Sequence, residues 1–118
     1  MLWKDIQNKK DWDNLLDSPC PFHQKLRQYV YLLDLLSLML GFGELTITSF
    51  IRLDNTKSLH YYARALDIRV KDKSAYFYWG MSMIGQAIFA MNKQFRMNCH
   101  MELYNKIHQH IHIEIREK

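Results

Sequence analysis

The most constraining feature of this sequence is an apolar stripe with helical spacing in its first third. Large apolar side chains recur there at steps of three or four residues, which places them on one face of a helix: Phe22, Leu26, Tyr29, Leu33, Leu36 and Leu40. Pro19 and Pro21 break the segment before the stripe, because proline fixes φ and lacks an amide proton. Gly41 and Gly43 follow it, as glycine commonly does after a helix. The pattern predicts one long amphipathic helix.

The rest of the chain alternates between strand-like segments, loops and one further helical pattern. β-Branched residues and alternation predict strands at 45–51, 63–70, 99–104 and 111–115, and a helix at 78–95. Residues 1–18 fit a short amphipathic helix or a packed arm. We therefore expect an α+β fold with a mainly antiparallel sheet packed with helices. The 118 residues suffice for one domain, 1–118, in which residues 1–21 form an N-terminal arm or short helix.

The charge and hydropathy pattern argues against two classes of partner. The net charge of +4 comes from Lys and Arg residues scattered along the chain, whereas a nucleic-acid binder gathers them into a stripe or arm. The longest apolar stretch, 30–42, is interrupted by Asp34 and Ser37 and is too short to span a bilayer. The first residues lack the pattern of a secretion signal, so we expect a cytoplasmic protein. We also expect the protein to be a monomer. We expect Cys20 and Cys99 to be free thiols, with a single disulfide as the alternative.

Two groups of side chains have the chemistry of metal ligands. Four histidines lie in the last nineteen residues: His100, His108, His110 and His112. His60 and Asp67 form the second group, and both imidazole and carboxylate are good zinc ligands. Asp67 falls within a predicted strand, where an ionised carboxylate needs a cation or hydrogen-bond donors. The alternatives are exposed imidazoles on a polar strand and a salt bridge from Asp67 to Arg69 or Arg52.

These residues also carry a resemblance to a known family. The segment with Ser58, His60, Ala65 and Asp67, followed much later by His110-Ile111-His112, resembles the zinc D-Ala-D-Ala carboxypeptidases and L-alanyl-D-glutamate endopeptidases, including phage endolysins. Their signature is Ser-x-His-x-x-Gly-x-Ala-x-Asp with a later His-x-His, and they share a fold with the hedgehog signalling domain. The resemblance covers about residues 25–116 and implies a small hedgehog/DD-peptidase-like domain.

The resemblance implies a role for each matching residue. His60, Asp67 and His112 would bind one Zn²⁺, and a peptide of bacterial peptidoglycan, with a D-amino acid at the cleaved bond, would be the substrate. Arg52 would hold a substrate carboxylate, for which its planar guanidinium is suited. Ser58 would support the site by hydrogen bonding, with a loop cap as the alternative. His110, which shares a strand face with His112, would orient water or stabilise the intermediate.

Two positions depart from the family pattern. Ala63 stands where the family has glycine, which is tolerable at negative φ but costly at positive φ. Gln109 stands where the family has its acidic general base, and His108 or His110 would have to replace it, with Glu102 and Glu114 as weaker candidates. Glu114 shares the face of His112 and is also a candidate partner of that ring.

Three functions follow from these positions. The first is a zinc peptidase acting on peptidoglycan. The second is a zinc domain with weak or no activity that binds cell-wall peptide or a protein partner, which the glutamine at the base position favours. The third is a structural or assembly protein whose histidines lie on the surface and bind no metal.

Overall fold

The computed structural model describes residues 1–70, 74–90, 95–102 and 110–117. Its elements are β1 (Leu2–Trp3), α1 (Ile6–Asn14), α2 (Pro21–Met39), β2 (Thr46–Ser49), the 3₁₀ turn η1 (Leu59–Tyr62), β3 (Ala65–Arg69), α3 (Ala75–Ala90), β4 (Phe95–Glu102) and β5 (His110–Glu117). The described strands form one sheet in the order β1-β2-β3-β5-β4. Only the β1–β2 pair is parallel among them, so the predicted α+β fold with a mainly antiparallel sheet is confirmed.

The long helix forms where the sequence predicts it. Pro21 occupies the first turn of α2, where its missing amide proton costs nothing. The chain turns away at Gly41, whose φ of 82° is open to glycine without a Cβ clash. The buried face differs from the predicted stripe: Leu26, Val30, Leu33 and Ser37 face the core, and Leu40 is exposed. Leu40 is already the C-cap residue, where the helix ends.

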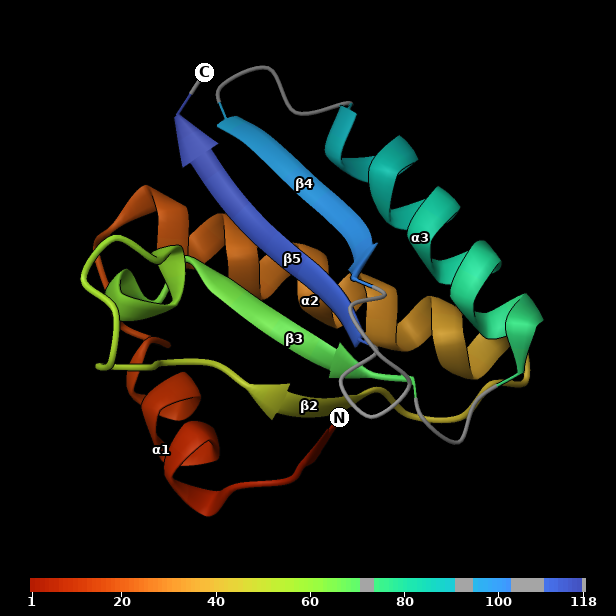
Figure 1. Cartoon of the computed structure of the whole chain (residues 1–118), viewed down its shortest axis with the longest axis horizontal. Coiled ribbons are helices and arrows are strands. Elements are labelled where there is room, and N and C mark those ends of the chain that lie inside the picture. The colour runs from red at the N-terminus through yellow and green to blue at the C-terminus, as the bar shows by residue number, and fades with distance from the viewer. Residues whose placement is uncertain (71–73, 91–94, 103–109, 118) are drawn as a thin grey trace.

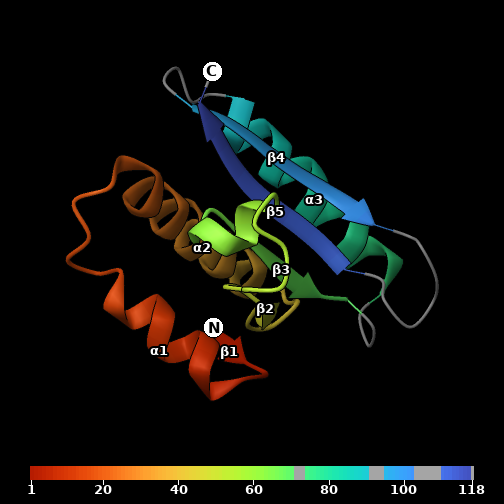
Figure 2. The same cartoon turned by 60° about the vertical axis from the view of Figure 1, so that its left-hand side comes forward.

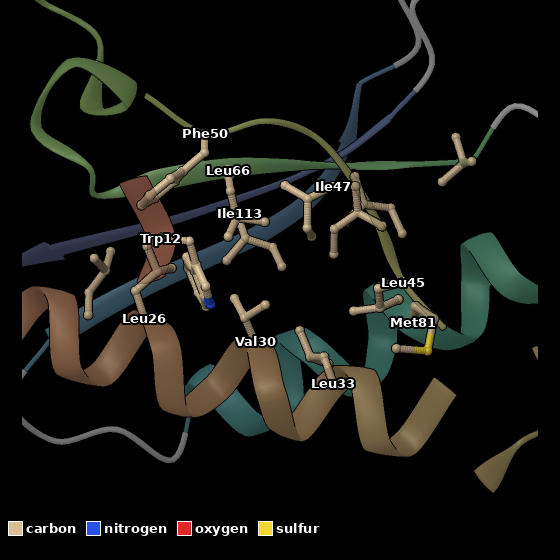
Figure 3. Close-up of a cluster of buried hydrophobic side chains, with 14 of the residues drawn as sticks. Trp12, Leu26, Val30, Leu33, Leu45, Ile47, Phe50, Leu66, Met81 and Ile113 are labelled. Carbon is tan, nitrogen blue, oxygen red and sulfur yellow. The ribbon is translucent and has the colours of Figure 1, made fainter. Parts of the chain in front are cut away.

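Helices α2 and α3 cover one face of the sheet. Strands β4 and β5 run side by side with α3 along β4 (Figures 1 and 2). The core lies between this helical layer and the sheet (Figure 3). Its central residues are Leu26, Val30 and Leu33 from α2, Met81 from α3, and Leu66, Ile111 and Ile113 from the strands. The alternate residues of β3 and β5 therefore belong to the opposite face.

The N-terminal segment packs as a short helix with a single aromatic anchor. Asp5 caps α1 by accepting a hydrogen bond from the amide of Gln7. Trp12 is buried and makes edge-on contact with the rings of Tyr31 and Phe50. The prediction of a short helix near the N-terminus is confirmed within 6–14, and β1 adds a strand that the sequence pattern did not indicate.

The third helix and the fourth strand differ from the predicted bounds. The sequence pattern predicts a helix at 78–95, whereas α3 spans Ala75–Ala90 and β4 begins at Phe95. Phe95 pairs with Glu117 across the β4–β5 ladder, so sheet pairing overrides the local helical pattern at this point. No helix in the described part of the chain combines the length and hydropathy needed to cross a membrane.

Candidate metal centre

The connection between β2 and β3 brings His60 onto the sheet. Ser58 caps the η1 turn, because its Oγ accepts a hydrogen bond from the amide of His60 at 3.2 Å. The backbone of His60 is also tied to the segment that follows β2, where the amide of Arg52 donates to its carbonyl oxygen at 3.4 Å. The His60 side chain is consequently held at 1% exposure. In Figure 3 this connection lies on the side of β3 away from α2.

Ala63 ends the η1 turn in a left-handed conformation. Its φ is 57° and its ψ is 34°, and it lies at the position where the zinc peptidases have glycine. A Cβ in this region is unfavourable by roughly 1–2 kcal/mol. The turn closes all the same, because the amide of Ala63 donates to the carbonyl of His60 at 3.3 Å and the amide of Arg64 to that of Leu59 at 3.0 Å. The costlier of the two expectations for this position therefore applies.

The β3–β5 register places the remaining ligand candidates opposite one another. Asp67 pairs with His112, and two pairs away along the ladder Arg69 pairs with His110 on one side and Ala65 with Glu114 on the other. Directly opposed residues of an antiparallel ladder share one face, so these six residues form two short rows on the side away from α2. The same register continues into β4, where His100 pairs with His112.

One oxygen of Asp67 faces two imidazole nitrogens. Its Oδ1 lies 3.3 Å from Nε2 of His60 and 2.8 Å from Nδ1 of His112. Nδ1 of His60 lies 2.6 Å from the carbonyl oxygen of Phe50. Because a carbonyl oxygen can only accept a hydrogen bond, Nδ1 carries the proton and donates it. Nε2 of His60 is therefore left with a lone pair, is buried, and has no hydrogen-bond partner among the described residues.

The Asp67 carboxylate stays ionised in this environment. Burial alone raises the pKa of Asp67, but the hydrogen bond with His112 and the attraction of the His60 and His110 rings, when these are protonated, outweigh it. The net pKa therefore lies well below its ordinary value of 3.8. The side chain is a permanent anion at neutral pH, surrounded by imidazoles.

The arrangement fits a divalent metal ion. His60, Asp67 and His112 each offer one ligand atom, and these atoms lie within 4.8 Å of one another. A buried lone pair that points at an anion is unfavourable unless a cation lies between them. Two imidazoles and one carboxylate are a common set of zinc ligands, and three protein ligands leave the fourth tetrahedral position open. These three residues can hold a metal ion.

The other predicted site residues lie at different distances from this centre. Nε2 of His110 is 3.7 Å from Oδ1 of Asp67, and its side chain is 19% exposed. Arg52 lies on the exposed connection after β2, and its guanidinium makes no ion pair with the described residues. Ser58 acts on the site through the backbone of His60. His108 and Gln109 lie outside the described residues. Cys20 is a free thiol, as expected.

Sequence reasoning missed the Phe50 carbonyl as a partner of the site. A backbone oxygen leaves no signal in residue type, and only the course of the β2–β3 connection brings it to His60. His100, one of the four clustered histidines of the sequence, pairs with His112 across β4 and β5.

Comparison with known proteins adds no assignment. No protein-family model matches the chain, and no curated protein or solved structure matches it either. The functional conclusion therefore depends on the geometry of these residues and on the resemblance of the signature that contains them.

Proposed function

We propose that this protein is a zinc peptidase that hydrolyses a peptide bond in bacterial peptidoglycan, next to a D-amino acid, in the manner of phage endolysins. The single observation that carries the metal part is the buried Nε2 of His60, which has no hydrogen-bond partner among the described residues and points toward Asp67. The peptidase part is supported by the signature residues Ser58, His60 and Asp67, which the fold brings together with His112.

His60, Asp67 and His112 would hold the ion. Bound zinc would polarise the scissile carbonyl and lower the pKa of a coordinated water. Asp67 supplies the negative charge that makes a divalent cation favourable at this depth. The Phe50 carbonyl fixes the ring of His60, so that Nε2 is presented without reorganisation.

His110 and Arg52 have positions suited to substrate chemistry. His110 is more exposed than the three metal ligands, yet lies within 3.7 Å of Asp67, so its imidazole can exchange a proton with a bound substrate. Arg52 is exposed and follows the strand that leads to Phe50, where its guanidinium can pair with a substrate carboxylate from solvent. Ser58 keeps the turn that carries His60 in place.

Metal content and hydrolysis are measured on the same preparation. Protein purified without chelators is expected to contain about one zinc per chain and to release new amino groups from purified peptidoglycan. The His110→Ala variant should keep the zinc and lose most of the hydrolysis, because His110 is not needed as a ligand. Protein that holds stoichiometric zinc but leaves every peptidoglycan peptide intact would rule out the peptidase.

A zinc domain without efficient catalysis is the second candidate. The observation that favours it is Gln109, a neutral side chain at the position of the family's general base. Under this alternative the domain binds a cell-wall peptide or a protein partner. The Gln109→Glu variant separates the two: a large gain in hydrolysis means that the natural protein is a weak enzyme. A rate that is measurable in the wild type and unchanged in the variant means that another group, such as His110, already serves as the base.

A further inference from the structure

We propose that Glu114 is a positioning residue of the metal centre, which accepts the Nε2–H of His112 and so presents Nδ1 of that ring to the ion. This inference rests on the proposed metal site. It concerns which nitrogen of His112 binds, and which side chain decides it.

The His112 ring lies between two carboxylates. Asp67 Oδ1 is 2.8 Å from its Nδ1, and Glu114 Oε1 is 3.4 Å from its Nε2. The ring can offer the metal only one lone pair, and the other nitrogen must then carry a proton. Asp67 is itself a ligand candidate, so the nitrogen beside it is the one that faces the ion. Glu114 stands at the other nitrogen, where an acceptor is needed.

Glu114 is held in place by its own partners. Its side chain is buried on the same face of β5 as His112, opposite the small Ala65 of β3. An ionised carboxylate at this depth needs compensation, and Arg116 supplies it by an Nε–H hydrogen bond to Oε2. The remaining oxygen, Oε1, is the one directed at His112.

The two ligand imidazoles consequently present different ring nitrogens to the ion. A backbone carbonyl holds the Nδ1–H of His60 and leaves Nε2 for the ion. A carboxylate holds the Nε2–H of His112 and leaves Nδ1 for the ion. Acceptors of this kind around ligating histidines commonly change metal affinity by about 10–100-fold when they are removed.

NMR of the wild-type protein tests the inference directly. The histidines are labelled with magnetic nitrogen, and NMR-active cadmium takes the place of zinc. Scalar coupling to cadmium is expected at Nε2 of His60 and at Nδ1 of His112, with a proton on Nε2 of His112. Coupling at Nε2 of His112 would overturn this inference and leave the metal site standing. A protein that binds neither cadmium nor zinc would overturn both.

Variants test the role of the carboxylate itself. The E114Q variant keeps the side-chain shape but removes the charge, so we expect zinc affinity to fall by about 10–100-fold. R116Q should have a smaller effect, because Glu114 remains. D13N removes a carboxylate of a surface ion pair with Lys9 and should leave affinity unchanged. Wild-type affinity in folded E114Q would contradict the proposal, and the wild-type NMR measurement stands even if E114Q fails to fold.

Discussion

Nε2 of His60 lies 3.3 Å from Oδ1 of Asp67, and the other nitrogen of the same ring donates to the carbonyl of Phe50. A lone pair and an anion thus face each other in a buried site. Either a proton or a metal ion must lie between them. The nearby Nδ1 of His112 supplies a third possible ligand atom, which favours the metal ion.

Zinc should stabilise the protein through His60. A ligand that binds only the folded state adds RT ln(1 + [L]/Kd), which is about 2.7 kcal/mol at a hundredfold excess over Kd. Bound metal is first removed with a chelator, and calorimetry then compares the melting temperatures with and without added zinc. We expect added zinc to raise the melting temperature of the wild type and to have no such effect on His60→Ala. His23→Ala is the matched control, because His23 bonds Ser18 and the Tyr62 carbonyl outside the cluster. Equal zinc shifts in wild type and His60→Ala would contradict the proposed site.

The low pKa of Asp67 predicts acid sensitivity of the metal-free protein. Above its ordinary pKa of 3.8 the carboxylate is ionised in both the folded and the unfolded chain, and its stabilising contribution is fully present. As the pH falls below that value, the unfolded chain binds a proton that the folded chain does not, so stability decreases. Urea unfolding across acidic pH should show a shallower pH dependence for Asp67→Asn. If the stabilities of the two proteins fall in parallel as the pH is lowered, the pKa of Asp67 is not depressed in the folded protein.

The left-handed conformation of Ala63 predicts an unusually mild Ala→Gly substitution. In extended or helical backbone, glycine costs about 0.5–1 kcal/mol, and a lost buried methyl about 0.8 kcal/mol more. At Ala63 these losses are offset by relief of the roughly 1–2 kcal/mol strain of a Cβ at positive φ. Ala63→Gly should therefore destabilise less than Ala65→Gly, a buried alanine in β3, by about 1–2 kcal/mol in urea unfolding. The reverse order would mean that Ala63 is not left-handed.

Trp12 should dominate the stability of the N-terminal segment. It is 1% exposed and its Nε1 donates to the hydroxyl of Tyr31 at 3.0 Å. Truncation of a buried aromatic side chain costs about 3–5 kcal/mol, so Trp12→Ala should lose that much free energy of unfolding. Trp79 is 63% exposed, and Trp79→Ala should change stability by less than about 0.5 kcal/mol. Similar losses for both would show that α1 does not pack on the core.

The sequence predicts this fold correctly where the local pattern of apolar residues agrees with the packing of the folded chain. The stripe around Leu26 and Leu33 indicates α2 correctly, because helical spacing and buried packing select the same residues. At Phe95 the local pattern is helical, but pairing with Glu117 decides the outcome, and no local pattern reveals a distant partner. The convergence of His60, Asp67 and His112 follows from the signature and from strand alternation together.

The finer parts of the site depend on backbone paths that residue types do not encode. The Phe50 carbonyl reaches His60 only because the β2–β3 connection folds back over the sheet. The φ of Ala63 is likewise set by closure of the η1 turn, since alanine by itself favours negative φ. Alternation predicts that Glu114 shares a face with His112, but only the structure shows which ring nitrogen it approaches.

Strand β5 follows β4 in the sequence, yet it lies between β3 and β4. A nascent chain whose β5 residues are still inside the ribosome therefore has a split sheet, with a gap where His112 and Glu114 belong. The proposed three-ligand site is incomplete until β5 has left the ribosome and inserted into this gap, so the ion would be captured only after the sheet has closed.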